Sequence, residues 1–352
     1  TITEAIIARA QHPSFGYFFP TDKYYDSIVQ WHEKRNGVTS LTKEHIGYEN
    51  GVLGGVVSAL NVLCSRGDNV LVHSPTYSGF TSCLTNAGYS IVLSPLVQDE
   101  QGIWRMDFED MEKKIVANHI HTALFCSPHN PCGRVWTREE IEKAMEVYKN
   151  NNCIVISDEI WADLVMNGNV QTPTQEVSED AKMRTIALYA PSKTFNLAGL
   201  CYASIIIPND EVRAKFQKQM GLQAFMHIER FGPVAHEAAY RHGAGWLEEL
   251  IQVIKGNYEY VRDFFAQHFP GVVVTELEGT YLVWCDFRCF GMSDADMKVF
   301  LTDECMLYLD NGTDFGAAGS GYQRINVACP RKTLADALDR FYQAARKRGM
   351  AR

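Results

Sequence analysis

Polar side chains follow three apolar segments that have the length of buried strands. Asn130 lies in SPHNPCGR, which comes after TALFC, and Asp158 lies in DEIW, which comes after IVIS. Lys193 lies in APSKTFNLAGL, close behind the apolar residues 186–190. Turns also favour Asn, Asp and Pro, so one such residue alone indicates little. Ligands collect at the carboxyl ends of parallel strands, and three polar residues there together predict a shared site.

Two further segments could contribute to such a site. The stretch ENGVLGG at residues 49–55 precedes a helical pattern, so its backbone N–H groups could bind a phosphate at a helix start. As a motif it is weak, because it is neither a Walker sequence nor G-x-G-x-x-G. Tyr77, in SPTYSGF, follows the strand-like VLVH. Its ring could lie against a flat ligand or pack in the core, and the sequence leaves both open.

The elements that would position these residues alternate between residues 50 and 210. Short β-branched runs at 70–72, 90–93, 122–126, 154–157, 185–190 and 203–207 are separated by helical patterns. Such alternation predicts an α/β unit with a mostly parallel sheet covered on both faces. One connecting helix has a capping box, Thr137 to Glu140.

Beyond residue 210 the pattern changes to long helices, including one over 246–265. Strands are predicted at 272–277 and 280–287, followed by two more helices. We therefore expect a large domain over 1–250 and a smaller α+β domain over 251–352. The chain begins without Met inside a helical pattern, residues 2–10, so we also expect a preceding segment.

The amino-acid composition argues against some classes of binding partner. The formal charge of -9, with acidic residues interleaved among the basic ones, argues against nucleic acid. The only basic cluster is residues 346–348, which suits the end of a helix. No apolar run is long enough to span a bilayer, and no signal peptide is recognisable.

The ten cysteines have no regular spacing. Five lie in or beside apolar runs and are expected to be reduced core residues of a cytoplasmic protein: Cys126, Cys153, Cys201, Cys285 and Cys329. Cys285 and Cys289 come closest to a metal-binding pair, but no second pair completes a site, so no metal is expected.

The motifs SPHNPCGR, DEIW and PSKTFNLAGL, in this order and separation, resemble the signatures of fold-type I pyridoxal-phosphate (PLP) enzymes, the aspartate-aminotransferase superfamily. The finer patterns PHNPxGRVWT and RINVACPR are similar to the cystathionine β-lyase branch, the MalY/PatB type of C–S lyases. The resemblance covers essentially the whole chain. It implies the PLP-transferase fold, an α/β sheet of the seven-stranded type flanked by helices, with a smaller α+β C-terminal domain.

The resemblance also implies roles for the polar residues. Lys193 would carry PLP as a Schiff base, since a partly desolvated lysine is neutral and nucleophilic. Asp158 would pair with the pyridine nitrogen and keep the ring an electron sink. Asn130 would hydrogen-bond the ring's 3-oxygen. Tyr77 would stack on the ring, and from Trp161 only an indole N–H could contact the 3-oxygen.

The phosphate and the substrate have their own expected partners. By the same matching, the backbone of Gly51, Val52 and Leu53 and the hydroxyl of Ser192 would hold the phosphate. Arg324 in QRINVACP would bind the carboxylate of an amino-acid substrate, because a guanidinium can fork onto it.

Three positions depart from the superfamily pattern. Ala190 lies where many members have a phosphate-binding serine, and Cys201 lies where aminotransferases have a phosphate-binding arginine. Trp161 replaces a tyrosine or histidine. The phosphate therefore has fewer charged partners here.

The favoured function is β-elimination from cysteine S-conjugates such as cystathionine, giving thiol, pyruvate and ammonia. Transamination of an amino acid with a 2-oxo acid uses the same residues and remains the main alternative. A regulatory binding module that keeps the fold is a third. The resemblance further implies at least a homodimer, in which Tyr17, within FGYF, reaches the phosphate in a neighbouring subunit; an aromatic cluster in the core is the alternative for Tyr17.

Overall fold

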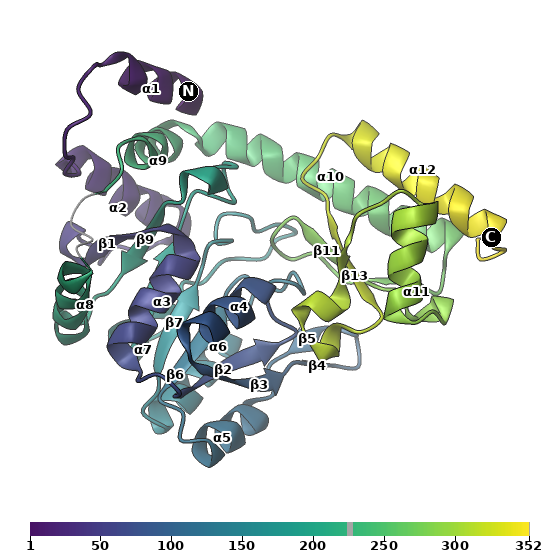
Figure 1. Ribbon diagram of the computed structural model, residues 1–352, viewed down its shortest axis with the longest axis horizontal. Coiled ribbons are helices and arrows are strands. Elements are labelled where there is room, and N and C mark those ends of the chain that lie inside the picture. Colours follow the sequence, from purple (N-terminus) through teal and green to yellow (C-terminus); the bar gives the residue numbers. More distant parts are fainter. Residues whose placement is uncertain (224–227, 352) are drawn as a thin grey trace.

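The computed structural model describes residues 1–223 and 228–351 of the chain, arranged around a seven-stranded and a four-stranded sheet (Figure 1). The strands are β1 Ile46–Glu49, β2 Asn69–Ser74, β3 Ser90–Pro95, β4 Val97–Gln98, β5 Trp104–Arg105, β6 Thr122–Cys126, β7 Ile154–Asp158, β8 Thr185–Tyr189, β9 Ala203–Ile206, β10 Val273–Val274, β11 Leu282–Asp286, β12 Asp310–Asn311 and β13 Tyr322–Asn326. The α-helices are α1 Ile2–Gln11, α2 Asp22–Asn36, α3 Gly51–Leu63, α4 Ser78–Ala87, α5 Phe108–Ala117, α6 Arg138–Asn150, α7 Glu179–Arg184, α8 Asp210–Leu222, α9 Phe231–His242, α10 Ala244–His268, α11 Asp294–Val299 and α12 Arg331–Lys347.

The large sheet has the strand order β1-β9-β8-β7-β6-β2-β3. The five strands from β8 to β3 run parallel, whereas β9 is antiparallel to both of its neighbours. All six strands predicted between residues 70 and 207 are present, so the prediction of a mostly parallel α/β sheet is confirmed. The edge strand β1 was not predicted.

Strand β6 shows why this sheet is covered on both faces. All of its residues are buried. Ala123 and Phe125 pack into an apolar cluster with residues of α5 and α6, whereas Leu124 and Cys126 pack into one with residues of α3, α4 and α8. Successive side chains of a strand point to opposite faces, so helices on both sides bury the whole segment. The predicted capping box of α6 is also present, with Thr137 and Glu140 bonded reciprocally.

The smaller sheet, in the order β10-β11-β13-β12, lies beside α10, α11 and α12 (Figure 1). The strand predicted at 272–277 is wrong in length, because β10 covers only Val273–Val274. The backbone of Glu278 and Gly279 turns away to donate to Gly133 O, and Thr280 has a left-handed φ of 70°. Such a backbone cannot continue a sheet ladder, so the next strand, β11, starts only at Leu282.

Helix α10 spans Ala244–His268 and therefore runs through the domain boundary predicted at residue 250. The division into 1–250 and 251–352 stays a prediction. Within the described ranges, none of the helices has the length and apolar character needed to cross a membrane.

Candidate active site

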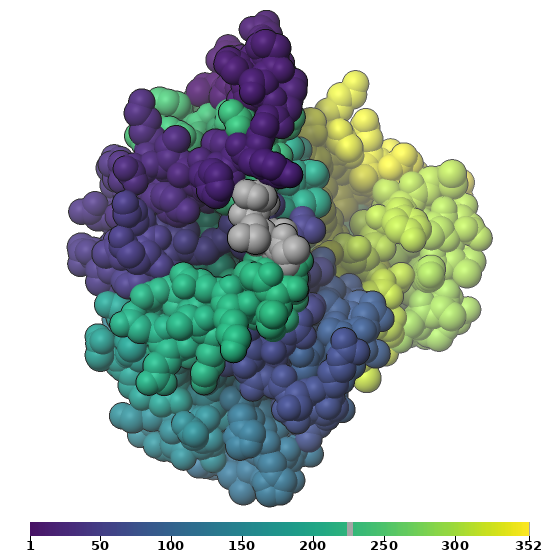
Figure 2. Space-filling model, turned by 60° about the vertical axis from the view of Figure 1, so that its left-hand side comes forward, coloured from purple at the N-terminus to yellow at the C-terminus, as the bar shows by residue number. Residues whose placement is uncertain are grey.

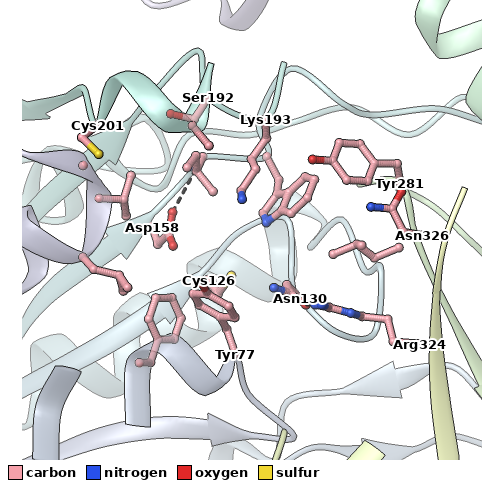
Figure 3. A pocket seen from close by; sticks show the side chains of 18 of the residues that line it. Tyr77, Cys126, Asn130, Asp158, Ser192, Lys193, Cys201, Tyr281, Arg324 and Asn326 are labelled. Atoms are coloured by element: carbon pink, nitrogen blue, oxygen red, sulfur yellow. Dashed lines mark hydrogen bonds between the residues drawn. The ribbon is translucent and has the colours of Figure 1, made fainter. Parts of the chain in front are cut away.

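A cavity of about 430 Å³ opens where the carboxyl edge of the large sheet meets β11 and β13. It brings together nearly every residue that the sequence predicted for the site. Those that line it are Gly51, Val52, Leu53, Tyr77, Asn130, Asp158, Trp161, Ser192, Lys193 and Arg324. Figure 3 shows Asp158, Ser192 and Cys201 at one end, Tyr281, Arg324 and Asn326 at the other, and Lys193 and Asn130 between them. We call the first of these, where Asp158 and Ser192 are buried, the buried end, and the second the outer end.

Tyr17 is the exception among the predicted residues. Its side chain is 83% exposed, and it lines a separate hollow with Phe15, Phe18 and Arg230. The single chain therefore does not bring Tyr17 to its own cavity.

Asp158 ends β7 at the buried end of the cavity and differs sharply from its neighbour Glu159. Glu159 accepts hydrogen bonds from Tyr189, Ser157, Thr174 and Gln171. Asp158 accepts one from the Ile160 N–H at 3.0 Å. Burial raises its pKa to about 7, although that N–H and Lys193 oppose the shift. A buried carboxyl that is short of donors and faces a cavity is suited to a cationic N–H ligand.

Lys193 lies in a tight turn after β8. Phe195 N donates to Pro191 O and Leu197 N donates to Ser192 O, which closes the turn on both sides of the lysine. The Lys193 Nζ lies 5.6 Å from the centroid of the Trp161 ring. Burial lowers the pKa of the amine and Arg324 adds to this, while Asp158 opposes it. Such a lysine is more easily neutral, and hence nucleophilic and basic, than one in water.

The start of α3 faces the buried end and offers free N–H groups. The N-terminal N–H groups of an α-helix have no partner within it, and Asn50 makes no side-chain cap here. Gly51 has a φ of 73°, which L side chains rarely adopt. A Cβ at Gly55 would lie 2.5 Å from Leu188 Cδ2, so a glycine there lets α3 approach β8 closely. With the Ser192 hydroxyl, these groups can bind an oxyanion.

Cys201 corrects a prediction. The sequence indicated a core cysteine, but Cys201 is exposed and lines the cavity. Its left-handed backbone, φ 47°, ends a short 3₁₀ turn before β9 begins. Cys126, Cys153 and Cys285 are buried as predicted, and Cys329 is partly buried.

Arg324 stands on β13 at the outer end, where it has three hydrogen bonds. Its Nη1 donates to Asn130 Oδ1 at 2.6 Å, and its Nε and Nη2 donate to Asp310 Oδ2 at 3.1 and 2.7 Å. Its guanidinium carbon lies 4.5 Å from the centroid of the Phe315 ring. The guanidinium is therefore held in place before any substrate binds.

A buried ion pair joins the loop that carries Asn130 to the segment that precedes β11. Arg134 Nε donates to Glu278 Oε2 at 2.8 Å, and Arg134 Nη2 donates to Glu140 Oε2 at 2.8 Å. Arg134 is 2% exposed. The ion pair therefore connects two segments that both contribute to the cavity, the first through Asn130 and the second through the neighbouring Tyr281.

Sequence reasoning missed several residues of the site. Tyr281, Asn326 and Cys126 line the cavity, and Asp310 holds Arg324. A signal for Asn326 was available, because residues 324 and 326 share one face of any strand that contains both. Nothing in the sequence pairs Asp310 with Arg324, which lies opposite it across the β12–β13 ladder.

The comparisons with known proteins identify the family. Residues 2–341 match the family model "Aminotransferase class I and II". The chain belongs to this family, which confirms the superfamily assignment made from the motifs.

Within the family the chain is similar to carbon–sulfur lyases. It is 35% identical to cystathionine β-lyase PatB of Bacillus subtilis, over 97% of this chain and 88% of that protein. It is 28% identical to protein MalY of Escherichia coli, over 95% of this chain and 85% of that protein. The crystal structure of cystalysin from Treponema denticola, which contains PLP, has a TM-score of 0.94 and 32% identity, covering 98% of this chain and 87% of that one.

The residues present fit PLP. The buried carboxyl of Asp158 is short of hydrogen-bond donors and suits a protonated pyridine nitrogen. The uncapped start of α3 with Ser192 suits a phosphate. Lys193 lies between these groups and Arg324, so an aldehyde and an amino acid can meet at its amine.

Proposed function

We propose that this chain is a PLP-dependent carbon–sulfur lyase that cleaves S-substituted cysteines by β-elimination. The observation that carries the proposal is the placement of a depressed-pKa lysine, Lys193, between a buried carboxyl and a pre-positioned arginine. The similarity to cystathionine β-lyases over nearly the whole chain supports the choice of reaction.

Different cavity residues would hold different parts of the cofactor. Asp158 would pair with the pyridine nitrogen, and Asn130 Nδ2 would donate to the 3-oxygen while Oδ1 accepts from Arg324. Tyr77, at the start of α4, would lie against the ring, since its own ring is fixed by an edge contact with Phe80 at 5.4 Å. The backbone of residues 51–53 and Ser192 would hold the phosphate.

When bound, PLP supplies an electron sink for the charge that develops at the substrate Cα. Arg324 binds the α-carboxylate and so fixes the orientation of the Cα–H bond. Lys193 Nζ, whose pKa is lowered by burial, accepts the Cα proton as the general base. The electron pair left at Cα then forms the Cα–Cβ double bond as the Cβ–S bond breaks. The thiolate leaves and takes up a proton, and water converts the remaining fragment to pyruvate and ammonia.

Transamination is the rival reaction, because it needs the same lysine, carboxyl and arginine. Curated relatives named as aminotransferases are less similar, for example at 23% identity. The similarity therefore favours elimination over amino-group transfer.

The test is to supply purified protein and PLP with cystathionine and a panel of other S-substituted cysteines. Equal amounts of pyruvate and free thiol are expected, with no need for a 2-oxo acid. Conversion of PLP to pyridoxamine phosphate that depends on a 2-oxo acid would favour transamination instead. Failure to bind PLP, seen as protein that stays colourless when PLP is added, would favour a binding module.

We further propose a homodimer in which Tyr17 reaches the phosphate site of the neighbouring subunit. Its exposed position outside the cavity of its own chain supports this. Sedimentation of wild type and Tyr17→Phe tests whether the chain forms a homodimer. The PLP affinity of both proteins tests whether Tyr17 reaches the phosphate site. We also propose a cytoplasmic location, which the unpaired state of all ten cysteines, each in the described part of the chain, supports.

A further inference from the structure

Two neutral hydrogen-bond donors line the outer end of the cavity and have no task in the reaction described above. They are the hydroxyl of Tyr281 and the side-chain amide of Asn326. Figure 3 shows both turned toward the cavity, above Arg324 in the view. We call them the donor pair.

The orientation of Asn326 follows from its hydrogen bond. Its Oδ1 accepts from the backbone N–H of Ala328 at 2.9 Å. Because an N–H can donate only to the oxygen, the amide nitrogen must be the atom that faces the cavity. Within the described part of the chain, nothing accepts a hydrogen bond from this Nδ2. Arg324 and Asn326 lie two residues apart on β13, so they share one face of the strand.

Tyr281 is fixed by contacts at its ring and at its backbone. Its ring meets Trp161 edge-on, with centroids 4.7 Å apart, and its carbonyl accepts from Val327 N at 3.0 Å. Its hydroxyl is without a partner among the described residues. Burial raises the pKa of Tyr281, with Arg324 opposing, so the hydroxyl keeps its proton at neutral pH and can donate it.

The proposed positions of the cofactor and of the substrate's amino and carboxylate groups leave the outer end for the far part of a substrate. The amino group lies at Lys193 and the carboxylate lies at Arg324. The end with Asp158 and Ser192 is the place for the cofactor. The sulfur substituent therefore extends along the wall that carries the donor pair.

We propose that the donor pair is a distal subsite for a hydrogen-bond acceptor, a carboxylate or carbonyl oxygen, on the sulfur substituent. This inference rests on the proposed function and names its substrate class: S-conjugates whose leaving thiol carries such an oxygen. The subsite holds two donors and no cation of its own. A substituent with an acceptor oxygen is therefore expected to bind there more tightly than a hydrocarbon of equal size.

The experiment compares two conjugates of equal size, S-carboxymethylcysteine and S-isobutylcysteine. The kcat/KM ratio of the first to the second is measured for wild type, Tyr281→Phe and Asn326→Asp. Comparing this ratio between proteins cancels the intrinsic difference between the two leaving groups. Asn326→Asp keeps the acceptor for Ala328 N–H and removes only the donor. Thermal unfolding midpoints show that the variants are folded.

Tyr281→Phe is expected to lower the ratio about tenfold, because a lost hydrogen bond to a charged group has about that effect. Asn326→Asp is expected to lower it at least as much, since carboxylate then faces carboxylate. A ratio that stays within about twofold of wild type in both variants overturns the subsite.

The outcome for the proposed function is separate. Pyruvate from S-isobutylcysteine supports the lyase whatever happens to the ratio. If no pyruvate forms from either conjugate, from cystathionine or from the rest of the panel, the proposed function fails. The same ratio measured as binding affinities, from the absorbance of protein-bound PLP, still decides the subsite.

Discussion

The buried end and the outer end of the cavity are built in different ways. At the buried end, Asp158 is the last residue of β7 and Ser192 follows β8, and both residues are buried. At the outer end, Arg324 and Asn326 come from one strand of the small sheet, and Asp310, which holds Arg324, is 47% exposed at its side chain.

This difference indicates that the two ends of the cavity have different roles. The buried side chains of the buried end have few alternative conformations, which suits a cofactor that stays bound through every turnover. An outer end held by partly exposed pairs can change by single substitutions without disturbing the large sheet. We therefore expect substitutions at the buried end to reduce catalysis and those at the outer end to change substrate binding.

Replacing Lys193 by alanine has the largest expected effect. In the proposed mechanism the chain then loses both the amine that carries PLP and the base that takes the Cα proton, so kcat is expected to fall by at least about 1000-fold. Pyruvate release measures this, with Lys113→Ala, an exposed lysine of α5, as the matched control. Activity in Lys193→Ala within tenfold of wild type would show that another group is the base.

Asp158→Asn tests the buried end next. The amide keeps an acceptor for Ile160 N–H but cannot stabilise a protonated pyridine nitrogen, so kcat is expected to fall about 100-fold with KM nearly unchanged. A rise in KM with kcat unchanged would instead assign Asp158 to substrate binding.

The same variant has a pH signature in the protein without PLP. The pKa of Asp158 is raised from 3.8 to about 7 in the fold, so between these values the native state holds a proton that the unfolded state has lost. The contribution of Asp158 to stability therefore falls as pH rises from about 4 to 7, by an amount on the order of a few kcal/mol. Between pH 5 and pH 8, urea unfolding should show the stability of Asp158→Asn rise relative to that of wild type. An equal change in the two proteins would mean that the carboxyl is ionised throughout.

Three cavity residues that come from the large sheet could be predicted from sequence, because each lies in one local motif. Asn130, Asp158 and Lys193 follow strands whose apolar runs are visible without any knowledge of the fold. Parallel pairing then brings strand ends together whatever the loop lengths, so local patterns were enough to place them.

The outer end could not be predicted in the same way, because it depends on pairing between distant segments. Arg324 meets Asp310 across β12 and β13, and Tyr281 depends on a left-handed Thr280 that ends the preceding segment. Cys201 was misplaced for a related reason, since its apolar neighbours suggested burial while its left-handed backbone leaves it exposed at the cavity. A position for Tyr17 at a neighbouring phosphate site needs a second chain.

Arg324→Lys tests the outer end itself. Lysine keeps the charge but cannot make the forked contact, so the KM for S-substituted cysteines is expected to rise about 30-fold with little change in kcat. Arg262→Lys, on the surface of α10, is the control. A large fall in kcat without a change in KM would place Arg324 in the chemical step.

Asp310 gives the smallest and most informative effect. A guanidinium has five N–H groups. Asp310 takes two of those on Arg324 and Asn130 takes one, which leaves one on each terminal nitrogen for the two oxygens of a substrate carboxylate. Asp310→Ala frees the guanidinium to move, and KM is expected to rise about threefold with kcat nearly constant, as for a partly exposed pair.

Asp310→Asn separates position from charge, because its amide oxygen still accepts from Arg324. If Asp310 acts by holding the arginine, KM for Asp310→Asn lies between those of wild type and Asp310→Ala. If its negative charge competes with the substrate carboxylate, both variants instead lower KM, and high salt reduces the difference between them and wild type. The two outcomes have opposite signs, so one series of KM measurements decides whether the outer end is adjusted by geometry or by charge.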